Sequence, residues 1–127
     1  MATSTKAAIA DPIGTAIFTV TETSSKLEGG AVTLDATSGS IIQVEIDNSN
    51  NTTPVYLNLY DVAGGVGIVI GTTDESFVFK APGSQKITYS CPNGSPYGSG
   101  LKAAIVSAPG GPTGPSSTVV AYVLVNT

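Results

Sequence analysis

Residues 40–62, SIIQVEIDNSNNTTPVYLNLYDV, contain the pattern that decides the fold. Apolar and polar side chains alternate twice in this stretch, first from Ile42 through residue 47 and again over residues 55–60. Such alternation indicates a half-buried strand, because successive side chains of a strand point to opposite faces of a sheet. The residues between the two runs, NSNNTTP at 48–54, are turn formers. The stretch therefore predicts a β-hairpin within an all-β protein.

The rest of the chain repeats short apolar runs separated by Gly, Pro, Ser and Asn. The predicted strands are 15–23, 31–36, 42–47, 55–60, 68–70, 77–79, 85–91, 101–108 and 118–125. Two segments rich in glycine and proline, 92–100 and 109–117, are predicted to be loops. Eight or nine short strands, with turn signals roughly every ten residues, are typical of an antiparallel β-sandwich, and we expect a jelly-roll-like one.

The last predicted strand, 118–125 (TVVAYVLV), is apolar on both faces. This composition predicts a central strand of a sheet, or a strand whose outer face is covered by another subunit. On the second interpretation Val123 and Val125 are candidates for a contact surface.

The length of 127 residues predicts a single domain with an ordinary hydrophobic core. We assign residues 15–127 to this β-sandwich domain. Residues 1–14 are small and polar, and Pro12 and Gly14 interrupt any regular run, so we expect irregular backbone in a short N-terminal arm. The arm is either disordered or lies on a neighbouring subunit, with Ile9 and Ile13 as its candidate contact residues.

Charged residues make up only 11% of the chain, and the net charge is −4. Nucleic-acid binding and attachment to an anionic membrane both need a basic surface, so we expect neither partner. No apolar run reaches the roughly 20 residues of a membrane-spanning helix, and no signal peptide is recognised. We therefore expect synthesis in a cytoplasm, which agrees with a single cysteine that has no internal disulfide partner.

Residue types that support catalysis are scarce. Histidine, the commonest general base, does not occur in the sequence, and Cys91 falls on the apolar side of its predicted strand. Glu45 and Asp47 share one strand face and, with Asn48 and Asn50, carry oxygens of the kind that bind calcium, but no calcium-loop signature is present. We favour a solvated strand face there, and the sequence predicts a protein that is not an enzyme and has no cofactor or metal.

From Tyr56 to Thr127 the sequence resembles small all-β virion proteins of tailed bacteriophages. The segments that carry the resemblance are VYLNLYD at 55–61, IGTT at 70–73, the Pro82-Gly83 turn, SGLKAA at 99–104 and the apolar last strand. The group it resembles most is the head decoration, or cement, proteins. This implies a non-enzymatic protein that binds and stabilises the major capsid lattice.

The resemblance further implies the major capsid protein as partner, a homo-oligomer with a trimer favoured, and a location on the capsid surface of the virion. Alternatives are a tail, neck or fibre component, or a carbohydrate- or receptor-binding β-sandwich module. Sugar binding normally uses exposed aromatic rings, for which the sequence offers Tyr60 and Tyr97. The predicted interaction surface therefore comprises Ile9, Ile13, Tyr60, Tyr97, Val123 and Val125.

Overall fold

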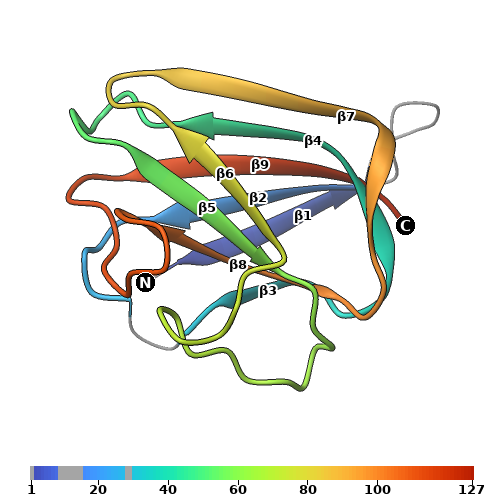
Figure 1. Cartoon of the computed structure of the whole chain (residues 1–127). Helices are drawn as coiled ribbons and strands as arrows, with labels where there is room; N and C mark the ends of the chain where they lie inside the picture. The colour runs from blue at the N-terminus through green and yellow to red at the C-terminus, as the bar shows by residue number, and fades with distance from the viewer. Residues whose placement is uncertain (1, 9–15, 28–29) are drawn as a thin grey trace.

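The computed structural model describes residues 2–8, 16–27 and 30–127, and these residues form nine β-strands in two antiparallel sheets (Figure 1). The strands are β1 (Thr3–Ala8), β2 (Ala16–Glu22), β3 (Val32–Asp35), β4 (Gly39–Asp47), β5 (Val55–Tyr60), β6 (Phe77–Ala81), β7 (Lys86–Tyr97), β8 (Leu101–Val106) and β9 (Val119–Asn126). Among the described residues no helix is long and apolar enough to cross a membrane.

The strand order confirms the predicted jelly-roll-like sandwich. One sheet has the order β1-β2-β9-β4-β7 and the other the order β3-β8-β5-β6. If β2 to β9 are numbered one to eight, the sheets read 1-8-3-6 and 2-7-4-5, which is the strand order of a jelly roll, and only strands four and five are neighbours both in the sheet and in the sequence. β1 adds a fifth strand at the edge of the first sheet.

The core lies between the sheets and is built from alternate residues of each strand. In β2 the side chains of Ala16, Phe18 and Val20 are buried, while the residues between them are half-buried. The last strand, β9, is the central strand of its sheet, as one of the two interpretations of its composition predicted. Its Val123 and Val125 point inward and belong to the core.

The predicted hairpin between the two runs of residues 40–62 is wrong. β4 pairs with β7 and β9, whereas β5 pairs with β6 and β8, so the loop 48–54 carries the chain from one sheet to the other. The side-chain amide of the buried Asn48 donates to the carbonyl oxygens of Thr53, Ala81 and Pro82 at 3.0 to 3.3 Å. The turn-forming residues at 48–54 therefore connect two sheets and do not close a hairpin. The buried Asn48 amide holds this loop against the end of β6, because it donates to the Ala81 and Pro82 carbonyl oxygens.

The register of β4 also differs from the simple alternation. It shifts between Ile41 and Gln43 in both of its ladders, which places Ile42 at a bulge. A bulge adds one residue to a strand and so changes which side chains face the core beyond it. Ile41, Val44 and Ile46 are buried, and Ile42 is only half-buried.

Three boundaries depart from the predictions. Thr3–Ala8, expected to be irregular, forms β1 and pairs with β2 along six residue pairs. Residues 68–70, expected to be a strand, form a turn region in which the amides of Thr72 and Thr73 donate to the carbonyl oxygen of Val69. β7 continues to Tyr97 through residues expected to be a loop, since the β4 ladder resumes beyond the bulge.

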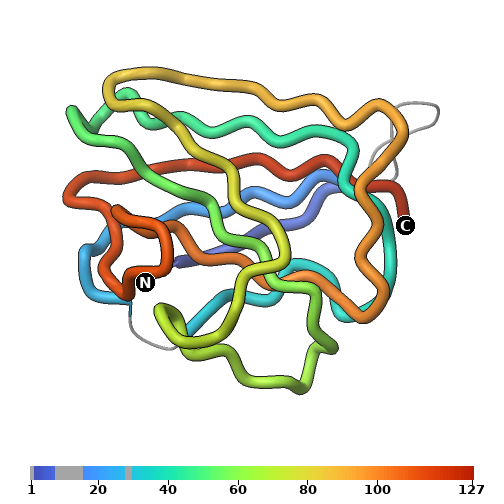
Figure 2. The backbone as a smooth tube through the Cα atoms, in the orientation of Figure 1, coloured from blue at the N-terminus to red at the C-terminus, as the bar shows by residue number. Residues whose placement is uncertain are grey.

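Two loops of the chain cover the outer face of the second sheet, and Figure 2 shows both beside that sheet. In the loop 62–76 the Val66 carbonyl accepts a hydrogen bond from the Lys102 ammonium, and Glu75 accepts one from the Asn58 amide at 3.3 Å. The loop 107–117 lies against the first one, since a Cβ added at Gly71 would meet Pro112 at 3.1 Å. The outward-facing residues of β5 and β8 are therefore buried, apart from the half-buried Tyr56.

Candidate binding surface on the outer face of the first sheet

The residues predicted to form an interaction surface do not come together on one. The side chains of Tyr60 and Tyr97 are 0% and 1% exposed, so neither ring can stack on a ligand. Val123 and Val125 are buried in the core between the sheets, so they cannot form a contact surface either. Ile9 and Ile13 lie outside the described residues.

Tyr97 instead closes one end of the sandwich. Its hydroxyl donates to the Asp35 carboxylate at 2.8 Å, and burial together with this carboxylate raises the pKa of Tyr97. Beside it, Asp61 accepts hydrogen bonds from the backbone amides of Gly98 and Ser99, both at 2.9 Å, and of Gly100. Partial burial acts to raise the pKa of Asp61, but these amides outweigh it, and the net pKa is lowered.

Within the described part of the chain, the outer face of the first sheet has no covering loop comparable to those on the second sheet. The ladders place on it Thr3, Thr5 and Ala7 of β1, Ile17, Thr19 and Thr21 of β2, Val120, Tyr122 and Leu124 of β9, Gln43, Glu45 and Asp47 of β4, and Lys86, Thr88 and Ser90 of β7. In its central row Tyr122 lies between Thr19 and Glu45. The face is rich in threonine and has few charged residues.

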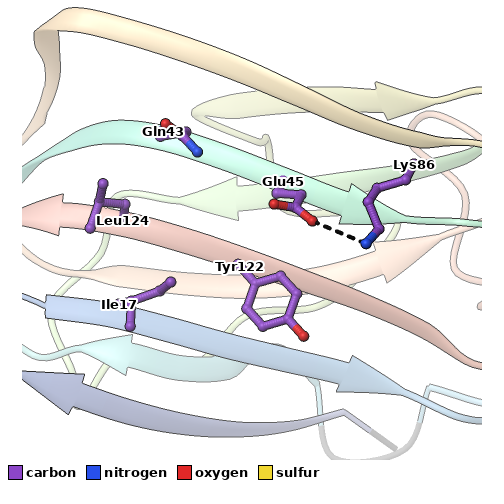
Figure 3. A pocket seen from close by; sticks show the side chains of 6 residues that line it. All are labelled: Ile17, Gln43, Glu45, Lys86, Tyr122 and Leu124. Carbon is purple, nitrogen blue, oxygen red and sulfur yellow. Dashed lines mark ion pairs between the residues drawn. The ribbon is translucent and has the colours of Figure 1, made fainter.

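A shallow depression of about 310 Å³ lies on this face. It is lined by Ile17, Gln43, Glu45, Lys86, Tyr122 and Leu124. Figure 3 shows the side chains of β2 and β9 forming an apolar half and those of β4 and β7 a polar half. The Tyr122 ring is seen face-on within the half formed by β2 and β9, and Tyr122 is 36% exposed. The depression thus combines one exposed aromatic ring with an amide, a carboxylate and an ammonium group.

The charges at the depression neutralise each other. The Lys86 ammonium lies 3.6 Å from the Glu45 carboxylate, and both side chains are accessible to water. An exposed pair of this kind contributes less than about 1 kcal/mol to stability, so its groups can exchange partners at little cost. The pair leaves both hydrogen-bond donors and acceptors at the polar edge of the depression.

The acidic groups singled out in the sequence do not converge on a cation. Asp47 accepts hydrogen bonds from the hydroxyl and the amide of Ser49, which lower its pKa, and the Asn48 amide is used within the loop. Among the described residues no group of three or more His, Cys, Asp or Glu side chains could hold a metal ion. Cys91 is a free, half-buried thiol.

No family model, no curated protein and no solved structure matches the chain. The surface described above is therefore interpreted from its own geometry and chemistry.

Tyr122 and its neighbours were missed in the sequence, although a signal was present. In 119–125 the alternation offers two sets, and the set of Val119, Ala121, Val123 and Val125 is the more uniformly apolar. Assigning that set to the core would have turned Tyr122 outward. Which faces stay open could not be predicted from this alternation, because it depends on loops that pack over a sheet from far away in the sequence.

Proposed function

We propose that this protein is a structural component of a virion, a decoration protein that binds and stabilises the major capsid lattice of a tailed phage. The resemblance of residues 56–127 to small virion proteins supports this function. The jelly roll is compatible with it, since viral capsid and lectin domains share this architecture, but a fold alone does not specify a function. The location on the capsid surface and the absence of catalysis are parts of the same proposal.

The observation that carries the proposal is the outer edge of β1, with which no other described strand pairs. An edge strand presents unpaired amide and carbonyl groups, on which another chain can add a strand. The other three edges are poorly suited to this: β7 contains Pro92 and Pro96, β3 has only four residues, and β6 ends just before Pro82. β1 has an unbroken register of six pairs and no proline, and the side chains of Thr3, Thr5, Lys6 and Ala7 are exposed.

Lys6 limits what can pair with this edge. Its ammonium group lies 5.7 Å from the centre of the Phe18 ring, on the side of β1 that faces the second sheet. A charge on the inner side of an edge strand opposes the stacking of many apolar strands. The β1 edge is therefore suited to one added polar strand, from the capsid lattice or from a neighbouring copy in a homotrimer.

The test measures binding and its location together. The full chain is incubated with capsid shells that lack it, and bound protein is separated by sedimentation. Hydrogen exchange of bound and free protein is then compared by mass spectrometry. We expect adsorption, with the amides of residues 3–8 becoming protected and those of β9 unchanged, because β9 is already paired on both sides. Failure to adsorb to any shell contradicts the function, and adsorption without protection of residues 3–8 contradicts the β1 edge as its site.

Oligomeric state and position provide a second check. Light scattering of the purified chain is expected to give three times the chain mass of 12.7 kDa. In images of particles, density for the protein is expected on the head surface. Density on the tail, neck or fibres would support the alternative structural roles and would contradict decoration of the capsid.

A further inference from the structure

We propose that the depression on the outer face of the first sheet binds a neutral saccharide, with one hexose or N-acetylhexosamine ring stacked on Tyr122. This function is additional to attachment to a capsid. The site lies on β2, β9, β4 and β7, whereas the attachment proposed above uses the free edge of β1. The two surfaces can therefore be occupied together.

The apolar half of the site suits one face of a sugar ring. A pyranose presents several C–H groups on one face and its hydroxyls around the rim, and an exposed aromatic ring offers an apolar surface beside a polar tip. The Tyr122 ring is exposed and seen face-on in Figure 3. Ile17 and Leu124 are cross-strand partners of each other and form the apolar floor next to it.

The polar half of the site suits the hydroxyls at the rim. Glu45 is the cross-strand partner of Tyr122, and Gln43 is the partner of Leu124, so a carboxylate and an amide flank the apolar strip in register. A carboxylate accepts hydrogen bonds, an ammonium donates them, and an amide does both, so adjacent hydroxyls can be bound as donor and acceptor. The Lys86 ammonium at 3.6 Å from Glu45 completes this set.

The same groups disfavour other small ligands. A phosphate or nucleotide would meet the Glu45 carboxylate, and the nearby cation, Lys86, is already paired with it on a protein of net charge −4. A purely apolar ligand would remove Gln43, Glu45 and Lys86 from water without giving them partners. A volume of about 310 Å³ is at the lower limit for ligand sites and is large enough for one sugar ring.

The binding test is an NMR titration of the isotope-labelled full chain with maltotriose, cellotriose, chitotriose, mannotriose and galactobiose. We expect at least one of these probes to shift the amide signals of Gln43, Glu45, Tyr122 and Leu124 in a saturable way. A single stacked ring predicts a Kd on the order of 1 mM. If no probe shifts these signals at concentrations about twentyfold higher, or if the shifts map to another face, the proposal is overturned.

Variants separate stacking from an effect on the fold. Tyr122→Ala is expected to weaken binding at least about tenfold, and Tyr122→Phe, which keeps the ring, is expected to stay within about threefold of the wild type. Tyr56→Ala is the matched control, because Tyr56 is a half-buried tyrosine on the outer side of the other sheet. Equal binding by Tyr122→Ala and the wild type overturns the proposal, as does loss of binding in the Tyr56 control alone. None of these outcomes depends on binding to capsids.

Discussion

The outer faces of the two sheets are both formed by alternate residues of their strands, but they differ in exposure to solvent. On the second sheet the outward residues Tyr60, Ala104 and Val106 are at most 2% exposed, because the loops 62–76 and 107–117 lie over them. On the first sheet the outward residues Val120 and Tyr122 remain partly accessible, Tyr122 at 36%, whereas Leu124 on the same face is 9% exposed. The difference shows that pointing away from the core does not place a residue on the surface. Loops decide which face is available to a partner.

Covering the outer face of the second sheet has a cost in stability, because it buries polar side-chain atoms. The Tyr60 hydroxyl and the side-chain oxygen of Asn58 are buried beneath the covering loop, and neither makes a hydrogen bond of normal geometry with the described residues, although the Asn58 side chain is near enough to act on the pKa of Tyr60 and lower it. A buried polar group left without a partner costs about 1–3 kcal/mol. The covering loop also leaves Val66 and Val69 exposed at 47% and 62%.

The largest expected effect comes from placing the same polar side chain on both faces. Val106→Asn puts an amide into a fully buried site and should lower the free energy of unfolding by about 3–4 kcal/mol, from lost apolar burial and an unpaired amide. Val120→Asn on the half-exposed face should change it by less than about 1 kcal/mol. Urea denaturation of both variants measures the difference, and equal effects would remove the distinction between the faces.

Alkaline pH should destabilise the protein through its buried tyrosines. Burial raises the pKa of both Tyr60 and Tyr97 above the value near 10 of an unfolded chain. The folded state then holds these protons more tightly, so their stabilisation is complete below about pH 10 and declines as pH rises above it. The urea midpoint should fall between about pH 10 and pH 12, and less steeply in Tyr97→Phe. A midpoint that stays constant to pH 12 would contradict this account.

A smaller effect is expected from removing the unpartnered hydroxyl on the covered face. Tyr60→Phe keeps the buried ring and deletes a hydroxyl that makes no hydrogen bond of normal geometry with the described residues. The free energy of unfolding should stay the same or rise by up to about 1 kcal/mol, because no bond is lost and desolvation of the hydroxyl is avoided. A loss above about 1 kcal/mol in thermal or urea unfolding would show that this hydroxyl does have a partner. Tyr97→Phe is the contrasting variant, since it loses the bond to Asp35.

The smallest effect is expected for the ring on the open face. Tyr122→Ala should lower the free energy of unfolding by about 1 kcal/mol or less, since the side chain is 36% exposed and packs mainly on the surface of its own sheet. The circular dichroism spectrum and oligomeric state should be unchanged. A loss of more than about 2 kcal/mol would indicate that this face contributes to stability as much as the covered face.

Much of the fold was predictable, because the alternation of apolar and polar residues along short segments indicates strands. The expected segments at 15–23, 31–36, 77–79, 101–108 and 118–125 all contain strands, and the antiparallel jelly-roll-like class is confirmed. The failures have one origin in common. The hairpin at 40–62, the strand at 68–70 and the loop at 92–97 all depended on which distant segment would pair with them. Turn-forming residues signal a change of direction but do not specify the next partner.

The candidate site illustrates the same limit. The sequence by itself determined that β9 would be apolar on both faces and that the chain would form strands with little charge. Only the tertiary structure decided that Tyr60 and Tyr97 are enclosed and that Tyr122 is presented beside Glu45. The physical reason is that alternation reports the two sides of one strand. The pairing of strands and the covering of faces arise from contacts between segments far apart in the chain.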